Sequence, residues 1–278
     1  MVKKKLIIAV TGSSGFVGTS FRKFLADQNI PAISIARKKH RSFKSEKTLI
    51  SSSLDKISGL KCDVMVHLIG TGAQTANSDY ESVNVKQTQK IIKLCKRSRI
   101  KKIIYISGLG VDESATLGYF ISKLRAEKLI MSSGLDYTIF RASYIVGTND
   151  PLTQNLTKQI KKGIIIIPGS GSYRLQPISI DDVCQVILAA ATNKKLSNKI
   201  IDLVGPKTIS FANYVKKFNN KKAKIKKIPL EQAYHIALNE PRKSLYGVDD
   251  LNIMVGDFTS NSKKLEKICG INLKNLVL

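Results

Sequence analysis

The sequence contains no tryptophan, only four cysteines and few acidic residues. The cysteines are widely spaced and form no C-x-x-C pair, which argues against a disulfide framework and a cysteine-based zinc site. They are Cys62, Cys95, Cys184 and Cys269. No apolar run approaches the length needed to cross a bilayer, so no membrane span is predicted.

Acidic residues number 20 against 46 lysines and arginines, which gives a formal net charge of +26. The charge is densest in the lysine-rich stretch 216–227. Nucleic-acid-binding surfaces usually add arginine and stacking aromatic side chains, whereas this stretch is mostly lysine. We therefore expect a solvated surface, or one that attracts an anionic ligand or partner, and no nucleic-acid partner.

The length and composition are those of an ordinary globular protein. A chain of 278 residues with 43% hydrophobic content can bury a sizeable core as one large domain with a small lobe. Three lysines at positions 3–5 precede an apolar stretch, residues 6–10, that is too short for a signal peptide. We expect a cytoplasmic protein.

Strand-like and helix-like patterns alternate along the first half of the chain. Strands are expected at 6–10, 32–36, 64–69, 102–107 and 137–142, and helices at 16–28, 79–99 and 119–133. Nearly continuous apolar strands that alternate with helices predict an α/β fold, a doubly wound parallel sheet of the Rossmann type. Residues 1–150 should form this dinucleotide-binding core, and residues 151–278 a mixed region that completes the sheet and forms a small substrate lobe.

A glycine-rich turn follows the first strand and opens the first helix. Its spacing, G-x-x-G-x-x-G at Gly12, Gly15 and Gly18, differs by one residue from the usual dinucleotide fingerprint. In a strand that leads through a glycine turn into a helix, free backbone N–H groups and the positive end of the helix dipole face the same point. An anion binds there. The predicted contacts with the dinucleotide are Gly12, Ser14, Gly15, Phe16, Val17 and Gly18.

A second constellation places Tyr119 and Lys123 four residues apart on one helix face. A nearby cation favours phenolate and lowers a tyrosine pKa, and the same lysine can hold a ribose hydroxyl. Y-x-x-x-K alone usually marks an ordinary helix surface, but about a hundred residues after a dinucleotide turn it predicts a proton donor and its activating cation.

These motifs resemble the short-chain dehydrogenase/reductase superfamily, in its atypical and extended branches, over most of the chain. Further matching phrases are Val83-Asn84-Val85, Ser107-Gly108-Leu109-Gly110, Leu135 to Arg141 and Gln176 to Val183. They look most like the group of the respiratory complex I nucleotide-binding accessory subunit and the nitrogen-regulation repressor-like proteins. The resemblance implies cofactor contacts at Gly70, Ser107, Ser143 and Tyr144 and a substrate cleft bordered by Arg174 and Gln176.

One departure from this superfamily concerns catalysis. Catalytic members place a serine or threonine where this chain has Leu109, which cannot donate a hydrogen bond to a substrate carbonyl. Ser107, Ser114 and Ser122 are the candidates to replace it. Enzymatic activity therefore stays open at this point, whereas cofactor binding does not depend on that residue.

The cofactor preference depends on the end of the second strand. An NAD-preferring site carries an acid there to bind the ribose 2′-hydroxyl, but this chain has Ala36 followed by Arg37 and Lys38. Cations at this place suit a 2′-phosphate. We therefore expect NADP(H) to be favoured over NAD(H).

Three functions agree with these observations. The first is an NADP(H)-dependent oxidoreductase that acts on a small carbonyl or hydroxyl substrate. The second is a non-catalytic NAD(P)H-binding sensor or accessory subunit with a protein partner, which Leu109 favours. The third is a sugar-nucleotide epimerase or dehydratase, which uses the same Tyr/Lys pair with an NAD-type pocket.

Overall fold

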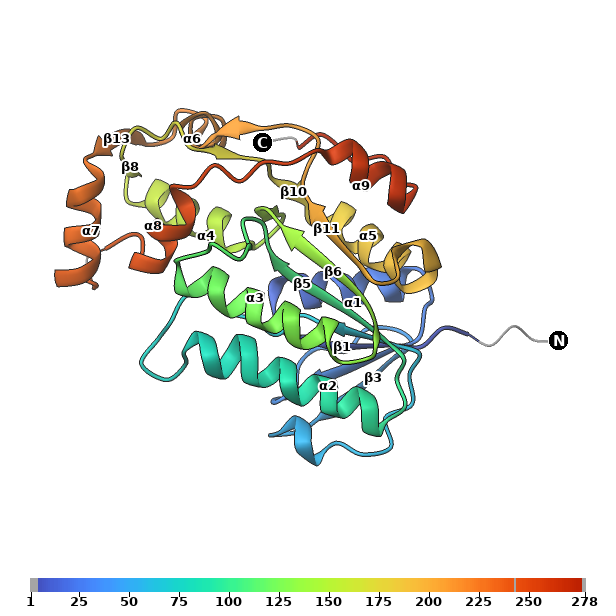
Figure 1. Ribbon diagram of the computed structural model, residues 1–278. Helices are drawn as coiled ribbons and strands as arrows, with labels where there is room; N and C mark the ends of the chain where they lie inside the picture. Colours follow the sequence, from blue (N-terminus) through green and yellow to red (C-terminus); the bar gives the residue numbers. More distant parts are fainter. Residues whose placement is uncertain (1–4, 243, 277–278) are drawn as a thin grey trace.

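The computed structural model describes residues 5–242 and 244–276, and its centre is a seven-stranded parallel sheet (Figure 1). The strands run in the order β3-β2-β1-β4-β5-β6-β11. Their bounds are β1 Ile8–Thr11, β2 Ala32–Ala36, β3 Glu46–Ile50, β4 Val64–His67, β5 Lys102–Gly108, β6 Asp136–Ala142 and β11 Lys199–Leu203. The order reverses between β1 and β4, and ligands of such sheets bind at that switch point. The predicted doubly wound Rossmann fold is confirmed.

Helices cover both faces of the sheet (Figure 1). On one face pack α1 (Phe16–Asp27), α5 (Ile180–Thr192) and α9 (Ser262–Cys269), whose buried side chains form one core with β1 and β4. On the other face pack α2 (Gln87–Arg97) and α3 (Gly118–Met131). Because the central strands are buried on both sides, they need apolar residues at successive positions, which is the pattern that the sequence shows.

A third core lies among elements that follow residue 145. These are α4 (Pro151–Lys161), β8 (Ile164–Pro168), α6 (Phe211–Asn219), β13 (Lys224–Ile228), α7 (Leu230–Asn239) and α8 (Val248–Met254), together with the short strands β7 (Ile145–Val146), β9 (Arg174–Leu175) and β12 (Ile209–Ser210). They gather at the end of the molecule beyond the carboxyl ends of β5 and β6 (Figure 1). The short strand β10 (Ile178–Ser179) pairs with β7, and its Ile178 belongs to the core of α1 and α5. Within residues 5–242 and 244–276, no helix has both the length and the apolar character that a bilayer crossing requires.

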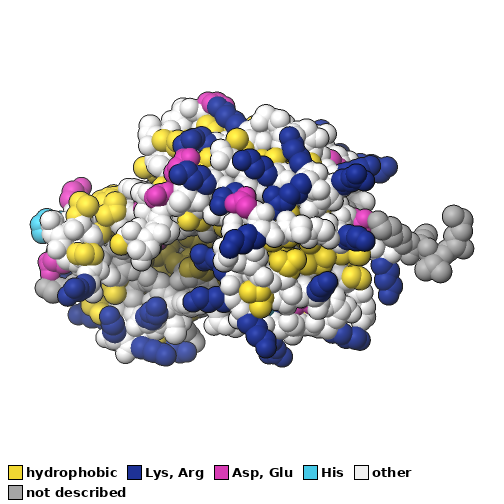
Figure 2. Space-filling model, turned by 90° about the horizontal axis from the view of Figure 1, so that it is seen from below, with side chains coloured by type: hydrophobic (Ala, Val, Ile, Leu, Met, Phe, Trp, Pro, Cys, Tyr) yellow, Lys and Arg dark blue, Asp and Glu magenta, His cyan; other side chains and the backbone are white. Residues whose placement is uncertain are grey.

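Two of the longer strands, β3 and β13, were not predicted from the sequence, and neither were the two-residue strands β7, β9, β10 and β12. The strand β3 lies at the sheet edge with a half-exposed pattern, so it lacks the apolar run that marked the other strands. The strand β13 falls inside the lysine-rich stretch 216–227 and pairs in parallel with β8. Its lysines 224, 226 and 227 are exposed. On the face shown in Figure 2, lysine and arginine side chains are likewise spread over the surface, with few acidic ones among them.

A buried ion pair joins α1 to the edge of the sheet. The Arg22 and Glu46 side chains are 2% and 1% exposed, and Arg22 Nη2 donates to Glu46 Oε2 over 2.9 Å. Arg22 Nη1 also donates to the Ser13 carbonyl oxygen over 2.8 Å. Burial by itself raises the pKa of Glu46, but the hydrogen bonds from Arg22 and from the Phe43 N–H outweigh that effect and lower it. Arg22 therefore fastens the glycine turn to β3.

We expect Arg22→Met to lower the free energy of unfolding by about 3–5 kcal/mol, because the substitution leaves the Glu46 carboxylate buried without its partner. Urea denaturation at neutral pH measures this. The control is Lys23→Met, which removes an adjacent lysine that is 66% exposed and paired only with Asp27. It should change the free energy by less than about 0.5 kcal/mol. Equal effects of the two substitutions would contradict the role given to Arg22.

Candidate dinucleotide site and catalytic pair

The glycine turn brings three backbone segments into contact at the end of β1. Gly12 has a φ of +65°, and a Cβ on it would lie 2.6 Å from the carbonyl carbon of Leu68, which follows β4. A Cβ on Gly18 would lie 2.2 Å from the Gly12 carbonyl oxygen. Neither position tolerates a side chain, so α1 begins directly above the carboxyl edge of the sheet.

The N-terminus of α1 is open toward a cleft. Gly15 caps the helix without a side-chain acceptor, and the first turn holds no acidic residue. The first-turn N–H groups therefore have no side-chain cap, which suits a phosphate. The cleft has a volume of about 590 Å³. Every predicted cofactor contact except Ser14, Arg37 and Lys38 lines it, as do Tyr119 and Lys123.

Tyr119 and Lys123 project from α3 into this cleft. The Tyr119 hydroxyl lies against the end of β5, 2.9 Å from where a Gly108 Cβ would be. Lys123 Nζ donates to Tyr105 Oη and to the Ile106 carbonyl oxygen, both over 3.2 Å. It lies 5.9 Å from the centre of the Tyr119 ring. The structure thus joins the predicted pair at the carboxyl edge of β5, with Lys123 held by two groups that the sequence did not single out.

The protonation of this pair differs from the sequence-based expectation. Burial raises the pKa of Tyr119 to about 12, so the expectation that Lys123 lowers it is wrong for this structure. Burial lowers the pKa of Lys123 to about 8, against the opposing effect of the Glu127 carboxylate. The reason is geometric, because Lys123 Nζ donates to β5 and to Tyr105 rather than to the Tyr119 hydroxyl. At neutral pH Tyr119 is therefore a protonated phenol.

Buried polar groups hold α3 and the loop after β4. Asn84 is fully buried in a π-helical turn, residues 81–86, a distortion that often occurs at functional sites. Its amide binds both backbone groups of Thr71 and donates to Ser122 Oγ over 2.9 Å. His67 is also fully buried and bonds to Thr11 Oγ1 and Thr88 Oγ1. These contacts fix the floor of the cleft.

Two buried hydroxyls of the cleft, Ser107 Oγ and Ser143 Oγ, have no hydrogen-bond partner among the described residues. The other serines considered as replacements are occupied: Ser122 Oγ donates to the Tyr119 carbonyl oxygen, and Ser114 Oγ bonds to Asp112. A buried polar atom without a partner is unusual and marks a place where a ligand group fits. Of the three candidate replacements, Ser107 is therefore the one whose hydroxyl has no partner among the described residues.

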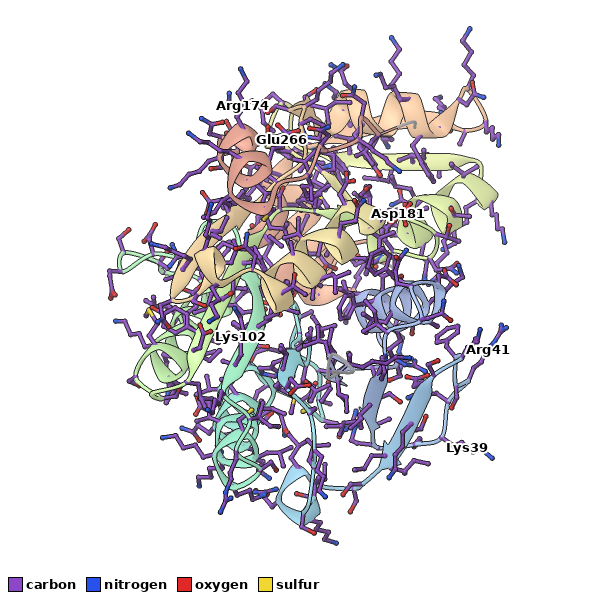
Figure 3. All side chains as sticks on the ribbon, turned by 90° about the vertical axis from the view of Figure 1, so that its right-hand side faces the viewer. Lys39, Arg41, Lys102, Arg174, Asp181 and Glu266 are labelled. Carbon is purple, nitrogen blue, oxygen red and sulfur yellow. The ribbon has the colours of Figure 1, made fainter. Side chains whose placement is uncertain are left out.

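Arg37 and Lys38 follow β2 directly and are exposed, outside the cleft lining. Their loop packs back on the glycine turn, since His40 Nε2 lies 3.2 Å from Ser13 Oγ and the Arg41 carbonyl oxygen accepts from Arg22 over 2.6 Å. Lys39 and Arg41 project outward from the same loop (Figure 3). Cations thus gather at the edge of the sheet next to the glycine turn.

Arg174 and Gln176 do not border the cleft, so that expectation is wrong. Gln176 is buried, donating to the Gly205 carbonyl oxygen and accepting from the Ser260 N–H. Arg174 pairs with Asp257 and lies at the other end of the view from Lys39 (Figure 3). It lines a separate groove of about 930 Å³ beside α6.

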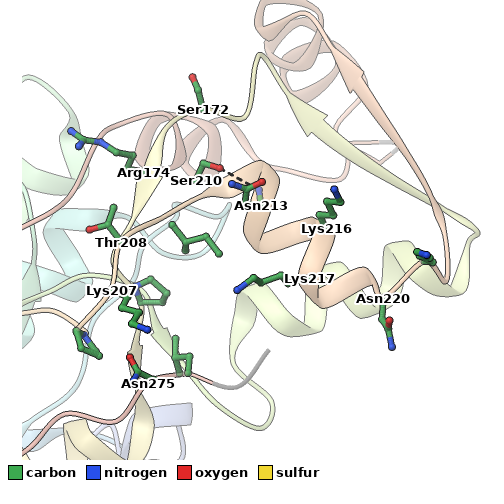
Figure 4. A pocket seen from close by; sticks show the side chains of 15 residues that line it. Ser172, Arg174, Lys207, Thr208, Ser210, Asn213, Lys216, Lys217, Asn220 and Asn275 are labelled. Atoms are coloured by element: carbon green, nitrogen blue, oxygen red, sulfur yellow. Dashed lines mark hydrogen bonds between the residues drawn. The ribbon is translucent and has the colours of Figure 1, made fainter.

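This groove is basic. Lys207, Lys216, Lys217 and Lys221 line it with Arg174, and the lining contains no acidic residue among those described. Figure 4 shows Lys216 and Lys217 on α6 and Lys207 on the segment across from it. Within the lysine-rich stretch 216–227, Lys216, Lys217 and Lys221 therefore face a groove, whereas Lys224, Lys226 and Lys227 lie on β13.

Comparison with known proteins places this geometry in a family. Residues 8–203 match the NAD-dependent epimerase/dehydratase family, a stretch that includes the whole seven-stranded sheet. The chain belongs to this family. The predicted membership of the extended short-chain dehydrogenase/reductase superfamily is confirmed.

Among curated members related to this chain are subunits of respiratory enzymes. The mitochondrial NADH dehydrogenase (ubiquinone) 1 alpha subcomplex subunit 9 of Arabidopsis thaliana is 29% identical over 52% of this chain and 37% of its own length. Its Dictyostelium discoideum counterpart is 22% identical over 76% of this chain and 62% of its own. The chain thus spans less than two thirds of the length of these relatives.

Solved structures of sugar-nucleotide proteins share the fold of this family member. MoeE5, solved with UDP-glucuronic acid and NAD, aligns with a TM-score of 0.76 at 15% identity over 96% of this chain and 94% of its own. A nucleoside-diphosphate-sugar epimerase from Staphylococcus aureus gives 0.74 at 18% identity over 97% and 98%. At this level of identity the likeness concerns the fold alone.

The buried His67 makes stability depend on pH. Burial, with the nearby Lys123 charge, lowers the pKa of His67 from 6.5 to about 3. Between these values the unfolded chain binds a proton that the folded chain does not, so the free energy of unfolding should fall as the pH is lowered, by up to about 1.4 kcal/mol per pH unit.

Urea denaturation between pH 7 and pH 4.5 measures this slope. We expect His67→Gln to reduce it, whereas His235→Gln, a change at an exposed histidine, should leave it unchanged. An unaltered slope in His67→Gln would show that another group carries the pH dependence.

Proposed function

We propose that this protein is an NADP(H)-binding oxidoreductase that exchanges a hydride with a small carbonyl or hydroxyl substrate. The observation that carries the proposal is the placement of a protonated Tyr119, a cationic Lys123 and an unpartnered Ser107 hydroxyl in one cleft beside the open N-terminus of α1. A proton donor, a cation and a hydrogen-bond donor next to a phosphate site form the set that carbonyl reduction needs.

The residues present fit a dinucleotide. The backbone of the glycine turn from Gly12 to Gly18, with Ser14, would hold the pyrophosphate. Gly70 offers a close backbone approach, Lys123 a donor to a ribose hydroxyl, and Ser143 with Tyr144 a polar edge for the nicotinamide amide. Residues 1–150 would bind the cofactor and residues 151–278 would supply the substrate lobe.

When bound, the nicotinamide supplies or accepts the hydride. Tyr119 donates its phenolic proton to the carbonyl oxygen in the reductive direction, which its pKa of about 12 allows at neutral pH. Ser107 donates a hydrogen bond to the same oxygen, in place of the hydroxyl that Leu109 lacks. Lys123 stabilises the negative charge that develops on Tyr119 as the proton leaves.

The preference for NADP(H) is proposed from Arg37 and Lys38, since both follow β2 and neither is accompanied by an acid that would repel a 2′-phosphate. We expect Arg37→Asp to weaken NADPH binding at least about tenfold while changing NADH binding little, because the new carboxylate faces the 2′-phosphate. Thermal-shift titration with NADPH, NADP, NADH and NAD measures this. Equal weakening of NADPH and NADH binding would contradict the proposed preference for NADP(H).

A second function, a non-catalytic NAD(P)H-binding subunit, is favoured by two observations. One is that curated relatives are subunits of NADH dehydrogenase. The other is the basic groove beside α6, which would suit an acidic partner surface (Figure 4). This function predicts that the cofactor binds and that no carbonyl compound is turned over. Ser107→Ala and Leu109→Ser, described next, should then produce no change in turnover.

For the oxidoreductase, we expect Ser107→Ala to lower kcat by about tenfold to a hundredfold through loss of the hydrogen bond to the carbonyl. Leu109→Ser should raise kcat, since it returns a hydroxyl to the usual place. The measurement is NADPH oxidation with a panel of aldehydes and ketones.

Two controls separate chemistry from binding. Tyr119→Phe should abolish turnover and leave the NADPH thermal shift intact, and Ser114→Ala, a change at an exposed serine, should have no effect. Undiminished turnover in Tyr119→Phe would remove this residue from the mechanism.

A further inference from the structure

We propose that the substrate is an uncharged carbonyl compound with an apolar ring or short alkyl group beside the carbonyl, and not a nucleoside-diphosphate sugar. This inference rests on the proposed function, because it concerns the same cleft. It is carried by the residues that surround Tyr119 on the side away from the glycine turn and by the charges that line the cleft.

An apolar pocket of about 180 Å³ adjoins the Tyr119 ring. Its walls combine the end of β5, the end of β6 and side chains from α8 and the segment after it. Leu109, Phe120, Ile253 and Phe258 supply most of its side-chain surface, and no charged residue is among those described in its lining. The Phe120 and Phe258 rings lie 5.4 Å apart, so the segment after α8 is held against α3.

The volume of this pocket suits a small apolar group. A cavity of about 150 Å³ lined by aliphatic and aromatic side chains binds benzene in another protein. The pocket shares Tyr119, Ala142, Ser143 and Tyr144 with the larger cleft. A group that fills it would therefore place its attached carbonyl next to the Tyr119 hydroxyl. Leu109, which stands where catalytic members of the superfamily have a hydroxyl donor, also contributes to this apolar wall.

In the proposed function the N-terminus of α1 holds the dinucleotide, and the charges of the rest of the cleft do not suit a second diphosphate. Lys123 is the one cation among the described residues that line it, and it is held by Tyr105 and the Ile106 carbonyl oxygen. The other charged groups of the lining are the carboxylates of Asp150 and Asp250. A bound diphosphate normally needs arginine, lysine or a helix N-terminus. The helix N-terminus of α4 that borders the cleft is already capped by Asp150.

Asp250 contributes negative charge to the part of the cleft where the substrate would bind. It is exposed on α8, and its charge, together with burial, raises the pKa of Tyr144 on the facing wall. The neighbouring Asp249 accepts a hydrogen bond over 2.9 Å from the Gln74 N–H, which ties α8 to the loop after β4. The entrance on this side thus carries negative charge, which repels an anionic substrate and leaves a neutral one unaffected.

The test measures ligand binding to the protein with and without NADPH by saturation-transfer NMR, with acetophenone as the neutral probe and UDP-glucose as the anionic one. We expect acetophenone to bind saturably and UDP-glucose not to bind saturably. Ile253→Glu, which introduces a carboxylate into the pocket wall, should weaken acetophenone binding at least about tenfold. The matched control Ile253→Leu should bind acetophenone as the natural protein does.

Two results would overturn the inference: saturable binding of UDP-glucose that is tighter than that of acetophenone, or acetophenone binding that is absent or unaffected by Ile253→Glu. The NADPH thermal shift of each variant is measured alongside. If NADPH does not bind, the proposed function is wrong. If NADPH binds normally but acetophenone does not bind, only the assignment of the substrate is wrong. Binding of acetophenone without NADPH turnover supports the pocket and counts against catalysis.

Discussion

The close approach of backbone segments at the end of β1 is the constraint on which the rest of the site depends. Side chains at Gly12 and Gly18 would collide with the Leu68 carbonyl group and the Gly12 carbonyl oxygen. Because both positions are glycine, α1 starts over the sheet edge and points its unpaired N–H groups at the cleft. The same placement lets Arg22, one and a half turns further along α1, reach both the turn and Glu46 on β3. The turn is thus held by packing on one side and by a buried ion pair on the other.

Buried polar groups then determine which hydrogen bonds the Tyr119 and Lys123 side chains can make. Lys123 is held by β5 and Tyr105, while Asn84 joins the loop after β4 to Ser122 on α3. In a low-dielectric interior such bonds are strong when every group has a partner. Among the described residues that line the cleft, Ser107 Oγ and Ser143 Oγ are buried side-chain atoms without such a partner. These two unpartnered hydroxyls therefore indicate where in the cleft a ligand group would bind.

The fold of this family is compatible with several chemistries, and the side chains that line the cleft distinguish among them. The sheet aligns with MoeE5 at a TM-score of 0.76 although identity is 15%. Asp250 and the apolar wall of Leu109, Phe120 and Phe258 favour a neutral ligand. The basic groove beside α6 is separate from the cleft and shares no lining residue with it.

The sequence by itself determined the Rossmann sheet, the glycine turn and the pairing of Tyr119 with Lys123, because each depends on local spacing: alternating apolar runs, glycines three residues apart and two side chains one helical turn apart. It did not predict β3 or β13, whose half-exposed residues carry no continuous apolar signal. Only the tertiary structure decided that the Ser107 hydroxyl is unpartnered among the described residues, as that of Ser143 is, that Tyr119 stays protonated and that Arg174 lies outside the cleft. These properties depend on burial and on contacts between residues far apart in the chain, and no local pattern encodes them.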